Sequence, residues 1–255
     1  MDRRDFLRAV AVAGTAMSIR RVGAMDILTQ HMDAAGDKVD LVAVMGGEPE
    51  EMFRSGIEKL GGIKQFVKAG QKVVVKPNIG WDRVPELAGD SNPKLVAEIV
   101  KQCFAAGAKE VKVFDHTCDE WTKCYANSGI KTAAEAAGAQ MIPAHLESYY
   151  RPVTLPHGKS LKETKIHEAI LDADVWINVP VLKHHGGANL SISMKNLMGI
   201  VWNRRYFHSH DLQQCIADIC TLEKKPMLNV VDAYRLMKTN ENHSAIFRQN
   251  PKRKT

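Results

Sequence analysis

Residues able to bind an anion gather between positions 179 and 210, directly after an apolar run at 175–182. Lysine supplies positive charge, asparagine a directed hydrogen-bond donor, and glycine lets backbone N–H groups approach a ligand closely. A phosphate or a carboxylate suits this combination. The β-branched run before it indicates a buried strand, which would present the cluster at its carboxyl end. The anion-binding candidates in this stretch are Lys183, Gly186, Gly187, Lys195 and Asn196.

Polar side chains also follow other apolar runs. Lys76 and Asn78 end one such run, and Asp115 ends another. Each alone would equally cap a strand or begin a turn. Parallel strands, however, present their carboxyl ends at one rim, where open α/β proteins bind ligands. We therefore expect one pocket, lined by Lys76, Asn78, Lys183, His185, Lys195 and Asn196. The expected catalytic residues are His185, a proton-transfer group near neutral pH, and Asp115.

The histidines and one cysteine offer other kinds of site. Imidazole groups are common ligands of transition metals, and the candidates are His184, His208 and His210. Surface or hydrogen-bonded histidines are the more frequent outcome, so we predict no metal centre. Cys118 is a candidate nucleophile, but no partner in the sequence marks it as activated.

The elements that position these side chains follow from the hydrophobic pattern. Short β-branched runs alternate with segments of helical apolar spacing, which predicts a three-layer α/β fold with a mostly parallel sheet and helices on both faces. The expected strands lie at 40–45, 72–76, 110–114, 139–143, 175–182 and 227–231. The expected helices lie at 49–60, 94–106, within 120–137, at 161–171 and at 212–222, and the region 145–165 is expected to hold loops or short strands.

The strand-end motifs also resemble those of a known family. The pattern P-x-L-K-x-H from Pro180 to His185, and the pattern K-N-L-x-G from Lys195 to Gly199, resemble the signature of the DUF362 family. Val75–Asn78 and Val231-Asp232 add further matching pieces. The resemblance implies an α/β fold with a site at these motifs. Because some members carry a ferredoxin-like cluster module, it also implies redox or cofactor-related work.

We expect three parts in the chain: a signal segment at 1–24, a DUF362-like domain at 39–240 and an irregular basic tail at 241–255. Members of the family continue past this point with a glycine-rich segment and more α/β structure. The tail is therefore expected to depart from the family pattern or to be truncated.

The first 24 residues resemble a twin-arginine export signal. Arg3-Arg4 precedes Phe6-Leu7, a short apolar segment follows, and small residues before position 24 suit cleavage. These features predict recognition by the Tat translocase and a periplasmic location, or membrane anchoring through an uncleaved signal. An amphipathic amino-terminal helix is the alternative.

Charge and cysteine spacing limit the classes of partner and cofactor. The net charge of +6 comes from the first 24 residues and from residues 252–254, so the body between them is neutral and no nucleic-acid partner is expected. The five cysteines form no C-x-x-C pair, and we expect neither an iron–sulfur cluster nor a disulfide framework. The standard nucleotide-binding motifs, G-x-x-x-x-G-K-[ST] and G-x-G-x-x-G, do not occur.

The sequence thus predicts an exported enzyme that acts on an anionic small molecule at the strand-end crevice, in a redox or cofactor-related setting. The alternative is a non-catalytic protein that binds an anion or a metal there and serves a redox partner protein. The residues contain no complete catalytic constellation that would decide between the two.

Overall fold

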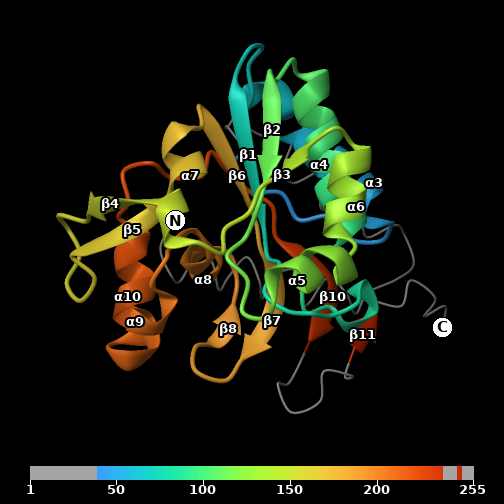
Figure 1. Ribbon diagram of the computed structural model, residues 1–255. Coiled ribbons are helices and arrows are strands. Elements are labelled where there is room, and N and C mark those ends of the chain that lie inside the picture. The colour runs from blue at the N-terminus through green and yellow to red at the C-terminus, as the bar shows by residue number, and fades with distance from the viewer. Residues whose placement is uncertain (1–38, 238–245, 249–255) are drawn as a thin grey trace. The chain divides into compact units, whose positions relative to one another are not determined.

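A parallel five-stranded sheet forms the centre of the domain (Figure 1). The computed structural model describes residues 39–237 and 246–248. The chain divides into two units, Met1–Asp40 and Leu41–Thr255, and the sheet belongs to the second. In spatial order its strands are β3 (Gln140–Met141), β2 (Glu110–Val113), β1 (Lys72–Pro77), β6 (Val175–Val179) and β9 (Leu228–Asn229).

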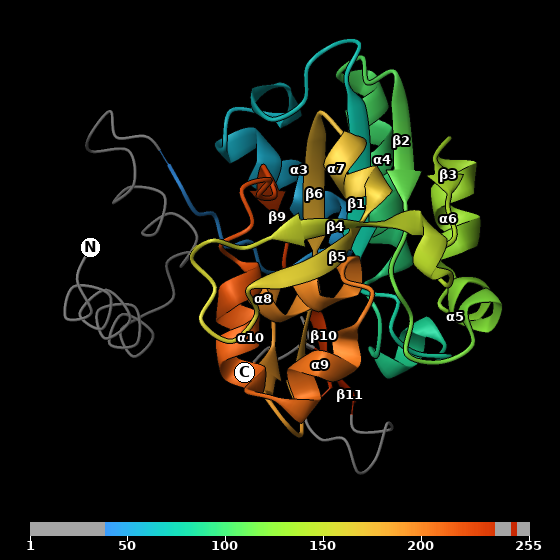
Figure 2. The same ribbon diagram turned by 60° about the vertical axis from the view of Figure 1, so that its left-hand side comes forward.

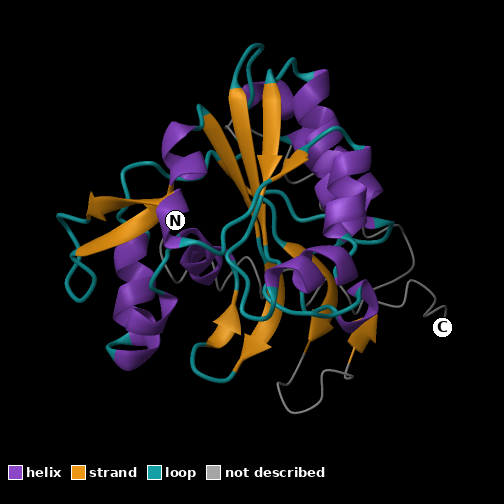
Figure 3. Ribbon diagram, viewed as in Figure 1, coloured by secondary structure: helices purple, strands orange, loops and turns teal. Residues whose placement is uncertain are grey.

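Helices cover both faces of this sheet (Figure 3), so the predicted three-layer α/β fold is confirmed. Strand residues alternate between the faces: Val73 and Val75 enter one core, and Val74 enters the other. The first core is completed by α3 (Pro49–Lys59), α4 (Pro93–Ala105), α5 (Trp121–Asn127) and α6 (Ile130–Ala136). The second is completed by α7 (Glu168–Asp172), η4 (Leu197–Ile200), α9 (Arg204–Ser209) and α10 (Leu212–Ile219).

A second sheet lies beyond the carboxyl end of β6. Its order is β11-β10-β7-β8, with bounds Ile246–Arg248, Asp232–Met237, Val181–His185 and Asn189–Ser191. The chain passes from β6 to β7 through Pro180, which has no N–H for a sheet ladder. The predicted single strand at 175–182 is therefore wrong, and two strands in different sheets take its place.

A β-hairpin occupies the region expected to be irregular. Strands β4 (Tyr150–Thr154) and β5 (Glu163–His167) pair antiparallel and pack on the face that carries α7 (Figure 2). The predicted helix at 161–171 is wrong, because Ile166 is fully buried as a strand residue and only α7 is helical. The apolar spacing there is compatible with both a helix and a strand, and pairing of β5 with β4 stabilises the strand.

Three other boundaries differ from the prediction. Residues 39–45 form no strand within the described part of the chain, and Leu41 and Met45 are largely exposed there. The helix expected within 120–137 divides into α5 and α6 at Gly129, whose φ of +71° lies in the left-handed region. The strand expected at 227–231 shortens to β9, and the next strand begins at Asp232.

The predicted signal segment at 1–24 lies outside the described residues. The predicted tail at 241–255 is described only at β11, which pairs with β10. Within the described residues, no helix is long and apolar enough to cross a membrane.

Candidate functional site

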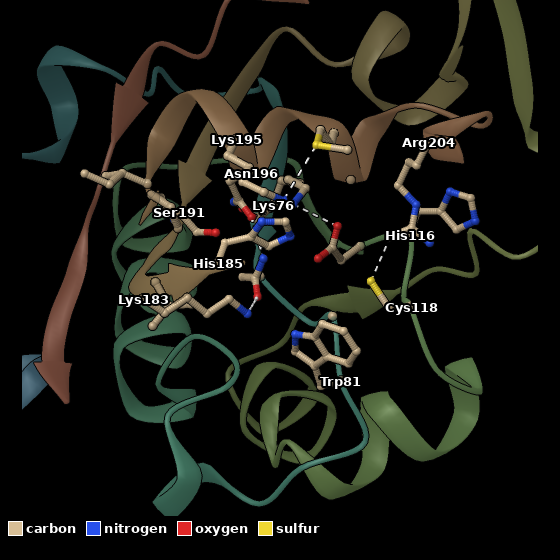
Figure 4. Close-up of a pocket in the computed structure, with 18 of the residues that line it drawn as sticks. Lys76, Trp81, His116, Cys118, Lys183, His185, Ser191, Lys195, Asn196 and Arg204 are labelled. Carbon is tan, nitrogen blue, oxygen red and sulfur yellow. Dashed lines mark hydrogen bonds and ion pairs between the residues drawn. The ribbon is translucent and has the colours of Figure 1, made fainter. Parts of the chain in front are cut away.

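A cavity of about 450 Å³ lies where the carboxyl ends of β1, β2 and β6 face the second sheet (Figure 4). All six residues predicted to share one pocket line it, namely Lys76, Asn78, Lys183, His185, Lys195 and Asn196. Asp115 lines it as well. The strands β1, β2 and β7, or the residues just after them, carry Lys76, Asn78, Asp115, Lys183 and His185. The short helix α8 (Ser193–Asn196) brings Lys195 and Asn196 to the same cavity.

Two almost fully buried residues of the cavity wall, Lys76 and Asp115, form an ion pair. The Lys76 ammonium lies 2.8 Å from Asp115 Oδ1. The ammonium also donates to Asn196 Oδ1 (3.0 Å) and to the Pro77 carbonyl (2.9 Å). Burial lowers the pKa of Lys76, and the Asp115 charge opposes that shift. Lys76 therefore has three acceptors inside the protein.

Asp115 is engaged on both oxygens. Its Oδ1 pairs with Lys76, and its Oδ2 accepts the Ile79 N–H at 2.7 Å. Gly199 packs against this pair so closely that an added Cβ would lie 1.9 Å from Asp115 Oδ1. These contacts favour a positioning part for Asp115. The catalytic role expected from the sequence stays a prediction.

A chain of amide hydrogen bonds runs from the cavity into the central sheet. Lys183 Nζ donates to Asn78 Oδ1 (2.8 Å), and Asn78 Nδ2 donates to Asn196 Oδ1 (2.9 Å). Asn196 Nδ2 then donates to Asn178 Oδ1, and Asn178 Nδ2 to Asn229 Oδ1, each at 2.8 Å. These bonds link the four amide side chains and Lys183 into one hydrogen-bonded network. Asn178 sits in the middle of β6, where the sequence pattern indicated only a buried strand.

Lys183 is 6% exposed, and it is held by the loop that follows β1. Its ammonium donates to the Gly89 carbonyl as well as to Asn78, and it lies 6.0 Å from the centre of the Trp81 ring. Burial lowers the pKa of Lys183, while nearby Asp90 raises it. Burial raises the pKa of Asp90 to about 7, although its Oδ1 accepts the N–H groups of Gly80 and Trp81.

Lys195 differs from these two lysines. Among the described residues its ammonium has one polar contact, the Met198 thioether at 3.7 Å. Burial, followed by the positive charges of Lys183 and Arg204, lowers the pKa of Lys195 to about 8. An anion entering the cavity would relieve both effects.

Arg204, at the start of α9, brings a guanidinium to the same cavity. Its Nη1 donates to Cys118 Sγ at 3.3 Å, and its Nη2 donates to the Thr117 carbonyl. Its Nε is buried and has no hydrogen-bond partner among the described residues. Cys118 is the exposed thiol among the described cysteines and also lines the cavity. The partner that the sequence did not reveal for Cys118 is thus Arg204, 86 positions away.

His185 and His116 face the cavity as neutral rings. His185 Nδ1 accepts the N–H groups of Gly187 (3.1 Å) and Ala188 (3.0 Å), which leaves the proton on Nε2. Burial and the Lys195 charge lower the pKa of His185 to about 4. His185 is therefore a hydrogen-bond donor at neutral pH, and the proton transfer expected of it near that pH does not fit this pKa. His116 Nδ1 donates to the Val201 carbonyl, and burial lowers its pKa to about 4.

The glycines and the other histidines lie elsewhere. Gly186 and Gly187 form the β7–β8 turn outside the cavity, and the Gly187 N–H serves His185, so the structure does not place them as an anion cradle. His208 lines the cavity, with its ring 6.0 Å from that of His185. His210 stacks on Tyr206, and His184 does not line the cavity. Among the described residues, no three His, Cys, Asp or Glu side chains are grouped as metal ligands.

The residues that escaped the sequence reasoning include Trp81, Gly199 as a packing requirement, and Arg204 as a cavity cation. Trp81 stands in a loop rich in turn residues, where an isolated aromatic carries little signal. Arg204 lies in a stretch that mixes basic and aromatic residues, a pattern that does not single it out.

Comparison with known proteins agrees with the motif analysis. A family model described as a domain of unknown function, DUF362, matches residues 73–250. The chain belongs to the DUF362 family. The match includes β1, β7, α8 and β10, which carry the motifs.

Two other proteins resemble this DUF362 chain. The thylakoid-associated protein sll1697 of Synechocystis sp. is 27% identical over 149 residues, which is 58% of this chain and 45% of that protein. The chain thus spans about half the length of the curated relative that it matches. The structure of the lactate racemase apoprotein from Thermoanaerobacterium thermosaccharolyticum has a TM-score of 0.49 and 15% identity, over 72% of this chain and 49% of that one.

Proposed function

We propose that this DUF362 chain is an enzyme that binds an anionic small molecule in the cavity. The observation that carries the proposal is the charge of the lining. Five basic side chains, Lys76, Lys183, Lys195, Arg204 and Arg205, stand against one carboxylate, Asp115, which Lys76 already engages. Lys195 and Arg204 retain unused donor capacity, and charge-assisted hydrogen bonds are the strong ones.

The same lining favours an enzyme over a simple anion carrier. A thiol, an amine of lowered pKa and a neutral imidazole N–H face one space. Thiols and amines act as nucleophiles, and an imidazole N–H can donate a hydrogen bond to a reacting oxygen. The redox or cofactor-related setting remains part of the proposal through the family resemblance. The alternative is a non-catalytic protein that binds an anion or a metal and serves a redox partner protein. Such a protein would bind its ligand without converting it chemically.

Anion binding is tested by thermal melting at pH 7 with sulfate, phosphate or citrate, against sodium chloride of equal ionic strength. We expect a rise in melting temperature that depends on the concentration of the polyvalent anion. Loss of one charge-assisted contact, in Lys195→Met or Arg204→Met, should weaken binding about 10- to 100-fold. Lys131→Met is the matched control, because Lys131 is half-exposed and pairs with Glu135 on α6.

Equal anion effects in all four proteins would refute an anion site at this cavity. Conversion of compounds in a library of anionic metabolites, followed by mass spectrometry, separates the enzyme from the carrier. Melting shifts without conversion of any compound would favour the carrier.

Export remains a proposal that rests on residues 1–24. Replacing Arg3 and Arg4 with lysine should retain the protein in the cytoplasm if the Tat translocase recognises the segment. Cell fractionation is the assay, and unchanged export of the double variant, or a wild type confined to the cytoplasm, would contradict the proposal.

A further inference from the structure

The three cavity lysines have unequal partners. Lys76 has three oxygen acceptors, and Lys183 has two, the Asn78 amide and the Gly89 carbonyl. Lys195 has only the Met198 sulfur among the described residues. The first two amines therefore belong to the framework of the site, and Lys195 presents its amine to the cavity.

The surroundings of Lys195 raise the fraction of its amine that is neutral. Partial burial removes hydration, and the Lys183 and Arg204 charges repel a further proton. With a pKa of about 8 in place of the ordinary 10.5, the fraction of neutral amine near pH 7 is on the order of 100-fold higher than for an exposed lysine. A neutral lysine amine in a cationic pocket is a nucleophile suited to carbonyl carbons.

Neighbouring groups suit a ligand that has a carboxylate beside a carbonyl. Arg204 lines the same cavity with a buried Nε that has no hydrogen-bond partner among the described residues, and guanidinium groups bind carboxylates well. His185 Nε2–H can donate a hydrogen bond to a carbonyl oxygen and polarise it. Among nearby charges, that of Lys195 lowers the pKa of His185 most. Figure 4 shows Lys195, Arg204 and His185 around one space.

We propose that Lys195 forms an imine with the carbonyl carbon of a small 2-oxo acid. The amine lone pair attacks the carbonyl carbon and gives a carbinolamine. The nitrogen then loses its protons, the former carbonyl oxygen leaves as water, and a C=N bond remains. Hydrolysis reverses the step, and no oxidant or reductant is consumed. This inference rests on the proposed anion site and narrows its ligand to a carboxylate that carries a carbonyl group.

The test is reductive trapping. The full chain is incubated with pyruvate or glyoxylate and sodium cyanoborohydride at pH 7.5, digested, and mapped by mass spectrometry. We expect a secondary-amine adduct at Lys195, formed on the order of 100-fold faster than at the exposed Lys131. Excess sulfate should slow the reaction at Lys195 and leave the reaction at Lys131 unchanged.

Lys195→Arg keeps the positive charge but cannot form an imine. It should lose the adduct while sulfate still raises its melting temperature, which also shows that it folds. Adduct formation at Lys195 no faster than at Lys131, or faster adduct formation that sulfate does not slow, would overturn the inference. If sulfate and pyruvate raise the melting temperature but no adduct forms at Lys195, the anion site stands and the imine fails. If neither raises it and no adduct forms, both fail.

Discussion

Replacing Asp115 with asparagine removes the counter-ion of a lysine that is 0% exposed. Asparagine is nearly isosteric and can still accept the Ile79 N–H, so the substitution changes charge more than shape. Lys76 then keeps its contacts with Asn196 and Pro77 but loses its ion pair. The result is an uncompensated buried cation.

The expected loss of unfolding free energy is about 3 kcal/mol. Breaking a buried pair by removing one partner costs about 3–5 kcal/mol. The two remaining oxygen acceptors place Lys76 at the lower end of that range. In Lys76→Met with Asp115→Asn neither charge of this pair remains, and apolar replacements of buried pairs are often close to neutral. We therefore expect the double variant to lose about 2 kcal/mol less than the two single variants together.

The assay is urea unfolding of the wild type, both single variants and the double variant.

The pH dependence of the unfolding free energy adds a second readout. Without Asp115, burial should lower the pKa of Lys76 further below the unfolded value of 10.5. Between the folded and unfolded pKa values the unfolded chain binds more protons, so the stability of Asp115→Asn should rise with pH relative to the wild type. Additive single losses, or a pH-independent deficit, would refute the assignment of this pair as a coupled buried unit.

Three further predictions concern the same site. Sulfate affinity, measured by calorimetry, should be full well below the Lys195 pKa of about 8 and fall as pH rises through it, whereas Lys195→Arg should bind equally well at pH 7 and pH 9. Gly199→Ala should destabilise the protein by about 3 kcal/mol in urea unfolding, since its Cβ would lie 2.6 Å from Lys76 Nζ, whereas Gly47→Ala, whose Cβ would meet its nearest neighbour at 3.4 Å, should change little. Iodoacetamide should alkylate Cys118 before the other described cysteines, and sulfate should slow that reaction; labelling indifferent to sulfate would place the anion elsewhere.

The sequence alone determined the layers of the fold and much of the rim. Apolar runs such as Val73–Val75 have a local period that sets which face each side chain takes, and a parallel sheet brings the residues after its strands to one edge. For that reason the sequence predicts Lys76, Lys183 and Lys195 in one pocket. The motif residues indicated the family, because a motif is recognised from residue types and spacing in the sequence and not from packing.

Only the tertiary structure decided which of these charges is paired. The Lys76 carboxylate partner and the Lys183 carbonyl partner come from distant segments, whereas Lys195 has only the thioether of nearby Met198. No local pattern distinguishes these three lysines. The tertiary structure also decided where β6 ends. The apolar pattern continues past Pro180, but β6 stops at Val179 and the next residues pair in a different sheet. Pairing and desolvation depend on distances across the fold, and those distances are set by packing of the whole domain rather than by sequence neighbours.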